Sequence, residues 1–175
     1  MRIALTGATG FLGSNIARHL HEQGHSVTAL VRATSTRAHI EPYVDRFAIG
    51  DHADKEAWPT LLEGADAIVH NSLDVASYRS QNWSAHLASN LVGSIELLLA
   101  SAPLPFVFVS TVAVHHANRP RWDSVVDEDH PMLPYNLYGA YKAAIEPHLW
   151  AAHHEHGRHT VSIRPSAVYG PDPTR

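Results

Sequence analysis

Short apolar runs rich in β-branched residues alternate along this chain with longer segments of helical patterning. Such runs predict strands, and strands separated by helical crossovers predict a parallel sheet covered by helices on both faces. The expected fold class is therefore α/β, with a doubly wound parallel sheet. About six strands are expected, at residues 2–6, 26–31, 46–49, 67–70, 106–110 and 160–164.

The bulk composition restricts the possible partners. At 175 residues, 45% hydrophobic and 17% charged, residues 1–175 are expected to form one globular domain. A formal charge of -4 without a basic run argues against nucleic acid and anionic membranes, and favours a small molecule. No apolar stretch reaches the length of a membrane span, and the first residues leave no room for a signal peptide. The absence of cysteine excludes disulfides and thiolate metal sites, and favours the cytoplasm.

The first expected strand runs into TGATGFLGSNIARHL, which places three glycines before an amphipathic helix. Glycines at such a turn let the backbone approach a pyrophosphate, and the helix N-terminus offers unpaired N–H groups. The GxxGxxG spacing is weak as a bare pattern, and a ligand-free turn is the alternative, whereas a Walker loop is excluded because no GK[ST] follows. The expected cofactor contacts here are Gly7, Thr9, Gly10, Phe11, Leu12 and Gly13.

The ends of the next strands suggest which dinucleotide is bound. Arg32 ends the second strand, where an acidic residue would bind the ribose 2'-hydroxyl and an arginine accommodates a 2'-phosphate. NADP is therefore preferred over NAD, although a merely solvated Arg32 would leave the choice open. Asp51, beside His52, is expected near the adenine amino group. The cofactor channel is expected to be lined by His70, Asn71 and Ser72.

Six collinear motifs resemble the extended short-chain dehydrogenase/reductases, which include sugar-nucleotide epimerases and dehydratases. They are TGATGFLG, Gly50-Asp51, Asn90 with Gly93 in NLVGSIELLLAS, FVSTVAV, YGAYK and RPSAVYGP. The resemblance covers nearly all of the chain. It implies a Rossmann-like fold, an NAD(P) coenzyme contacted also by Pro165, and hydride transfer on a carbinol or carbonyl substrate, with nucleotide sugars among the candidates. Net redox and internal-redox epimerisation or dehydration both fit.

The resemblance also implies a proton-transfer pair, Tyr138 and Lys142, in LYGAYKAAIE. Their four-residue spacing places both side chains on one helix face. An ammonium beside the phenol is expected to lower the tyrosine pKa from about 10 toward the working range. Lys142 would also bind the nicotinamide ribose. A surface helix that carries a YxxxK spacing by chance is the alternative.

The fifth strand ends in FVFVSTVAVH, and the family pattern S[ST]xxVYG places the catalytic hydroxyl at Thr111 rather than Ser110. That hydroxyl would orient the substrate oxygen, with strand-end capping as the alternative. Asn90 resembles the family asparagine that shapes its helix and holds a relay water, although a plain helix-face amide fits equally. His115 and His116 stand where Tyr-Gly is usual, so the local substrate pocket departs from the pattern.

No metal site is expected despite fifteen histidines. The cluster HHEHGRH lacks the HExxH spacing, and imidazoles near a helix C-terminus complement the helix dipole. The loop at residues 116–134 is expected to lie over the active site. A homodimer formed by the helices around Asn90 and from Tyr138 is expected by analogy with the family.

Family members continue beyond RPSAVYGP with a smaller substrate-binding region, which is absent from this chain. Substrate identity is therefore not readable. If this fragment is the whole protein, the edge of the sixth strand is expected to be exposed. A catalytically silent NAD(P)-binding sensor or interaction module is the alternative function. The intact Tyr/Lys/Thr set favours the enzyme, and the missing region favours the sensor.

Overall fold

Six parallel strands form one sheet in the order β3-β2-β1-β4-β5-β6. The structure, a computed structural model, describes residues 1–115 and 126–171. The strands are β1 (Arg2–Thr6), β2 (Ser26–Val31), β3 (Arg46–Ile49), β4 (Ala67–His70), β5 (Phe106–Val109) and β6 (Thr160–Ile163). The expected doubly wound fold class is confirmed, and each strand end agrees with its expected position to within one residue.

Most crossovers contain helices, as expected. The helical elements are α1 (Phe11–Glu22), η1 (Glu41–Tyr43), η2 (Lys55–Ala57), α2 (Trp58–Leu62), α3 (Val75–Arg79), α4 (Trp83–His86), the π-helix η3 (Leu87–Gly93), α5 (Ser94–Ala100), η4 (Val112–Val114) and α6 (Leu137–His156). Between β2 and β3 only the short turn η1 forms, because Pro42 and the run Thr34–Ser35–Thr36 disfavour a continuous helix. Among the described residues, no helix is long and apolar enough to cross a membrane.

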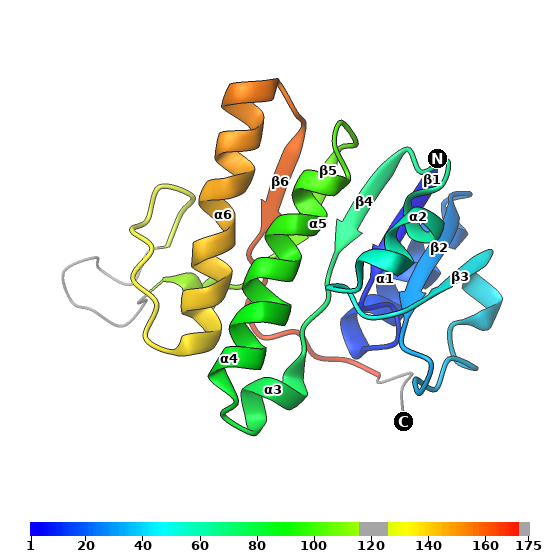
Figure 1. The fold of residues 1–175 in the computed structure, drawn as a ribbon, viewed down its shortest axis with the longest axis horizontal. Coiled ribbons are helices and arrows are strands. Elements are labelled where there is room, and N and C mark those ends of the chain that lie inside the picture. Colours follow the sequence, from blue (N-terminus) through cyan, green and yellow to red (C-terminus); the bar gives the residue numbers. More distant parts are fainter. Residues whose placement is uncertain (116–125, 172–175) are drawn as a thin grey trace.

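Two apolar clusters pack on opposite faces of the sheet, because successive strand residues point to alternate sides. On β1, Ala4 belongs to the cluster with α2, α5 and α6, whereas Leu5 belongs to the cluster with α1. Figure 1 shows α5 and α6 running side by side across one face. From α6, Tyr141, Ile145 and Leu149 enter the core at four-residue spacing. This packing fixes one face of α6 against β5.

β6 ends the strand order and pairs with β5. Among the described strands it has no second neighbour. Val161 and Ile163 on β6 are 53% and 48% exposed. The strand order reverses between β1 and β4, and ligands of open α/β sheets bind outside the carboxyl ends of the strands at such a reversal.

Candidate active site

A cavity of about 460 Å³ lies at the carboxyl ends of β1, β2, β4 and β5. We call it the dinucleotide cleft. The expected site residues that line it are Gly7, Thr9, Gly10, Phe11, Leu12, Arg32, Asp51, His52, Asn71, Ser72, Thr111, Tyr138, Lys142 and Pro165. Three further expected residues, Gly13, His70 and Asn90, lie outside this lining. Sequence reasoning gave no cofactor role to Ser166 and Val168, although both lie within the RPSAVYGP motif. It also missed Ser35 and Leu73, which belong to no pattern that separates them from ordinary loop residues.

The glycine turn allows the close backbone approach that its sequence predicts. Gly7 has φ +71, and a Cβ there would lie 2.7 Å from the carbonyl oxygen of Asn71. A Cβ on Gly13 would overlap the carbonyl of Gly7, so the lack of a side chain lets α1 pack closely against the glycine turn. Gly13 does not line the cleft. Gly10 caps α1 without a side-chain hydrogen bond. The first-turn N–H groups of α1 therefore meet the cleft without a side-chain acceptor.

His70 is completely buried, so the expectation that it lines the cofactor channel is wrong. Its Nδ1 lies 2.8 Å from Thr6 Oγ1, and its Nε2 lies 2.8 Å from Ser94 Oγ. Ser94 gives its hydroxyl proton to the carbonyl of Asn90, at 2.6 Å, so Nε2 of His70 is the donor and Nδ1 the acceptor. Burial lowers the pKa of His70 well below 6.5, which keeps the ring neutral.

This histidine holds one wall of the cleft through Thr6. Thr6 Oγ1 donates to His70 and accepts the backbone N–H groups of Asn71 and Ser72, at 3.0 and 3.2 Å. Every hydrogen-bonding position of the Thr6 hydroxyl is thus used. The polar residues that follow β4 are consequently fixed beside Gly7.

At the ends of β2 and β3 a carboxylate and an arginine share the cleft. Asp51 lies 3.0 Å from Nδ1 of His52, whose Nε2 lies 3.0 Å from the carbonyl of Ser89. The hydrogen bond from His52 lowers the pKa of Asp51 to about 2, burial opposes this, and the charge of Arg32 adds a smaller lowering. Asp51 is therefore an anion near neutral pH, and the exposed Arg32 lies within its electrostatic reach.

The end of β5 meets the first turns of α6. The Thr111 hydroxyl interacts with Tyr138, and Lys142 Nζ donates to the carbonyl of Val109 at 2.6 Å. α6 packs closely against the segment that follows β5 because Gly139 has no side chain. A Cβ on Gly139 would overlap the carbonyl of Ala113. Thr111, Tyr138 and Lys142 thus gather at one end of the cleft.

The pKa of Tyr138 is raised, so the expected lowering by Lys142 is wrong for this structure. Burial raises the pKa of the phenol, and Thr111 opposes this with a smaller effect. Lys142 is 3% exposed, and burial lowers its pKa from 10.5 to about 7, against an opposing contribution from Glu146. Desolvation therefore dominates at both residues. Near pH 7 the tyrosine is a phenol and the lysine is only partly charged.

The depressed pKa of Lys142 predicts a stability that depends on pH. Because the folded-state pKa is about 7 and the ordinary value is 10.5, the unfolded chain binds the extra proton between these values. The free energy of unfolding should therefore rise as the pH increases through this window. Between pH 7 and pH 9 we expect about 2 kcal/mol from this group. Urea unfolding at both pH values should show that Lys142→Met removes this slope.

The control for this experiment is Lys55→Met. Lys55 forms a surface ion pair with Glu96 and is the only other lysine of the chain. Its replacement should leave the slope unchanged, because exposed ion pairs contribute little. An identical pH dependence in wild type and Lys142→Met would contradict the buried, partly deprotonated lysine.

Asn90 lies in the π-helix η3 and is completely buried. Its Oδ1 accepts the backbone N–H of Asp74 at 2.6 Å, and its Nδ2 donates to the carbonyl of Asp74 and to Nδ1 of His86, at 3.2 and 2.9 Å. The amide therefore joins the widened helix to the start of α3. A relay water at Asn90 stays a prediction.

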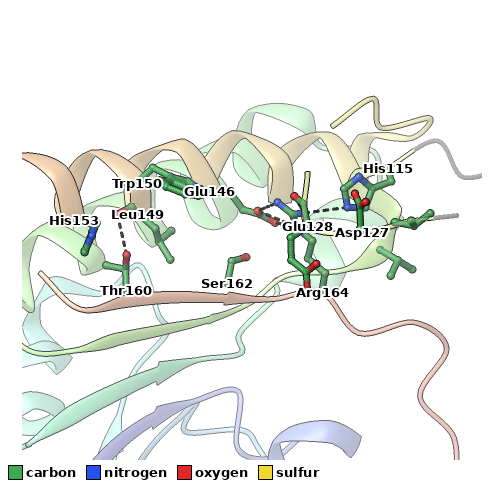
Figure 2. A pocket seen from close by; sticks show the side chains of 12 residues that line it. His115, Asp127, Glu128, Glu146, Leu149, Trp150, His153, Thr160, Ser162 and Arg164 are labelled. Atoms are coloured by element: carbon green, nitrogen blue, oxygen red, sulfur yellow. Dashed lines mark hydrogen bonds and ion pairs between the residues drawn. The ribbon is translucent and has the colours of Figure 1, made fainter. Parts of the chain in front are cut away.

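A second cavity, of about 630 Å³, lies between α6 and the edge of β6 (Figure 2). We call it the edge cavity. Residues 116–125, including His116, lie outside the described residues. The described part of the loop lines the edge cavity through Val126, Asp127 and Glu128 and is absent from the lining of the dinucleotide cleft. A position of the whole loop over the active site stays a prediction. In the described parts of the chain, no group of three His, Asp or Glu side chains is placed to hold a metal ion.

Comparison with known proteins agrees with this geometry. The profile of the NAD dependent epimerase/dehydratase family matches residues 3–175. The chain is 32% identical to a 4-hydroxy-2-methyl-3-oxo-4-farnesyl-3,4-dihydroquinoline-1-oxide ketoreductase of Stigmatella aurantiaca, covering 99% of this chain and 52% of that protein. It is also 32% identical to a dTDP-glucose 4,6-dehydratase of Streptomyces niveus, covering 98% of this chain and 55% of that one.

Solved structures of an epimerase also resemble this chain. The UDP-glucose 4-epimerase of Thermus thermophilus, in complex with NAD, superposes with a TM-score of 0.82 at 28% identity, covering 98% of this chain and 57% of that one. The chain spans about half the length of the curated relatives it matches. Because the family profile matches almost from end to end, the chain belongs to the NAD-dependent epimerase/dehydratase family of the short-chain dehydrogenase/reductases.

Proposed function

We propose that this chain binds a nicotinamide dinucleotide in the dinucleotide cleft and supports hydride transfer on a carbinol or carbonyl group. The supporting observation is one cavity of about 460 Å³ that is lined both by the glycine turn and by Thr111, Tyr138 and Lys142. The uncapped start of α1 and the missing Cβ of Gly7 suit a pyrophosphate. A bound nicotinamide would supply or accept the hydride.

The chain's own residues would handle the proton. With its raised pKa, Tyr138 is a phenol near neutral pH and can donate to a carbonyl oxygen. Thr111 would hold the same oxygen beside Tyr138. Lys142 lies at the same end of the cleft, held by the carbonyl of Val109, and would bind the nicotinamide ribose. A phenol at Tyr138 suits the role of the acid when a carbonyl is reduced.

NADP is the proposed coenzyme, because Arg32 lies exposed in the cleft at the end of β2. We expect NADPH to bind about 10-fold more tightly than NADH, and Arg32→Ala to weaken NADPH binding by about 10- to 100-fold with little change for NADH. Coenzyme fluorescence titrations measure both affinities. Arg37→Ala removes the same charge from a side chain that packs over Phe47, and should change neither affinity.

Equal affinities that persist in Arg32→Ala would contradict the NADP preference and leave NAD, the coenzyme in the complex of the Thermus thermophilus relative. Binding of neither form would contradict the proposed function itself. The alternative is a catalytically silent NAD(P)-binding sensor, which would bind the coenzyme without turning over any substrate.

We also propose that residues 1–175 act as the nucleotide-binding domain, with substrate specificity determined largely by other residues of a longer enzyme. A nucleotide sugar is one candidate substrate, because two of the relatives are named for dTDP-glucose and UDP-glucose. A homodimer through η3, α5 and α6 is supported by the exposed apolar side chains of Leu87, Val92, Leu99 and Trp150. The absence of cysteine favours the cytoplasm.

A further inference from the structure

Three successive turns of α6 hold three successive residues at the end of β5. Tyr138, Lys142 and Glu146 are spaced by four residues and share one helix face. The Thr111 hydroxyl meets Tyr138, the carbonyl of Val109 accepts from Lys142, and the hydroxyl of residue 110 donates to Glu146 at 2.5 Å. The first two contacts belong to the proposed acid/base pair. No sequence motif assigns a role to the third.

Glu146 is the centre of a buried ionic network that Figure 2 shows. Its side chain is 1% exposed, and Arg164 binds it with Nη2 2.6 Å from Oε2 and Nε 3.0 Å from the same oxygen. Arg164 also lies 3.1 Å from Nε2 of His115, whose Nδ1 lies 3.2 Å from the carbonyl of Pro131. A carbonyl oxygen only accepts, so Nδ1 of His115 carries the proton. The guanidinium of Arg164 only donates, so Nε2 is the acceptor and the imidazole is neutral.

This network connects the edge cavity to the dinucleotide cleft. Glu146 and Arg164 line the edge cavity. Ser110, which is hydrogen-bonded to Glu146, and Pro165, which follows Arg164 in the sequence, line the dinucleotide cleft. The backbone links the same segments, because Val112 N–H donates to the carbonyl of Pro165 at 3.0 Å. A buried carboxylate is costly unless it is fully paired, so the network fixes the end of β5, the end of β6 and α6 relative to one another.

We propose that Glu146 is a positioning residue for the Tyr138–Lys142 pair: it fixes Ser110 and Arg164 against α6 and places a negative charge one turn beyond Lys142. The proposal rests on the proposed function for its consequence in catalysis. The effect of Glu146 on the pKa of Lys142 can be measured without substrate or coenzyme.

The electrostatics agree with this geometry. Burial lowers the pKa of Lys142, and the charge of Glu146 is the contribution that raises it. Burial also raises the pKa of Glu146, but its hydrogen bonds with Arg164 and Ser110 outweigh this, so the pKa is lowered and the carboxylate stays ionised. His115 is neutral by its hydrogen bonds, and burial keeps His70 of β4 neutral. The ring of His130 packs against that of His115, and Asp127 and Glu128 line the same cavity as Glu146.

The experiment is a pH titration of the lysine side chains by NMR, with carbon-13 at Cε. The chain has two lysines, so Lys142 and the surface residue Lys55 give two signals, and Lys55 is an internal standard. In Glu146→Gln the pKa of Lys142 should fall by about 1 unit, because an opposite charge nearby shifts a pKa by this order. The signal of Lys55 should not move.

Two variants separate charge from packing. Glu146→Asp keeps the charge but is too short for the contact with Ser110, and should restore most of the Lys142 pKa. Glu96→Gln removes the partner of Lys55 and should leave Lys142 unchanged. If Glu146→Gln does not fold, the Glu146→Gln/Arg164→Gln double variant removes the whole buried pair, and the pKa of Lys142 should fall in it as well.

An unchanged Lys142 pKa in Glu146→Gln, or in the double variant that replaces it, would overturn the proposal. An equal fall in Glu146→Gln and Glu146→Asp would also overturn it, because packing alone would then explain the shift. NADPH titration of the wild type is a separate readout. Failure to bind coenzyme contradicts the proposed function but leaves the lysine titration valid as a test of Glu146.

Discussion

Gly10→Asp is expected to abolish coenzyme binding while leaving the chain folded. Gly10 is exposed with φ -82 and ψ 169, an extended conformation open to any residue, and a Cβ there would lie 3.6 Å from the nearest atom, the carbonyl oxygen of Gly7. An aspartate at this position caps α1, so the free energy of unfolding should stay within a few tenths of a kcal/mol or rise. The same carboxylate would occupy the first-turn N–H groups and repel a pyrophosphate. NADPH affinity should fall by at least about 100-fold.

Gly10→Asn is the matched control, because asparagine also caps the helix but carries no charge. Its affinity loss should be about 10-fold, and the difference between the two variants should shrink at high salt. Thermal unfolding and fluorescence titration of the same samples provide both quantities. A folded Gly10→Asp chain that binds NADPH within about 3-fold of wild type would contradict the phosphate site at α1.

Tyr138→Phe is expected to lower turnover by about 100- to 10,000-fold, the range that a positioned acid contributes. The measurement is coenzyme oxidation with a panel of carbonyl substrates, including nucleotide sugars, on a preparation that turns over at least one of them. Coenzyme affinity should stay within about 3-fold of wild type, because the phenyl ring keeps its packing against Tyr141 and Tyr78. This combination separates a lost proton donor from a damaged fold.

Tyr43→Phe is the control for the loss of a tyrosine hydroxyl, because Tyr43 packs against His21 on the opposite face of the sheet. Its turnover should match that of the wild type. If Tyr138→Phe also matched it, the enzymatic role of this tyrosine would be wrong, and the silent coenzyme-binding module would become the better account.

The strands can be predicted from sequence because each is a short apolar run between turns. Six such runs, from Arg2–Thr6 to the run that starts at Thr160, give the observed sheet with end shifts of at most one residue. The dinucleotide cleft follows from the same logic, because residues just after parallel strands meet at one edge. Arg32, Asp51 and Asn71 are lining residues for this reason.

What could not be predicted depends on burial in three dimensions. His70 directly precedes Asn71, yet one side chain is sealed behind the cleft and the other lines it. The four-residue spacing of Tyr138 and Lys142 correctly indicates a shared face, but the sign of the tyrosine pKa shift depends on desolvation, which a spacing does not reveal. Glu146 stands in the same helical series, and its contacts with Arg164, just after β6, and with Ser110 distinguish it from a surface glutamate.

The central claim is that the coenzyme occupies the dinucleotide cleft, and not the larger edge cavity. The most direct test is NADPH titration followed by backbone amide NMR. The predicted result is saturable shifts at Gly10, Phe11 and Leu12, together with Thr111 at the far end of the cleft. Shifts confined to Glu128 and Trp150 of the edge cavity, or no shifts at any coenzyme concentration, would contradict it.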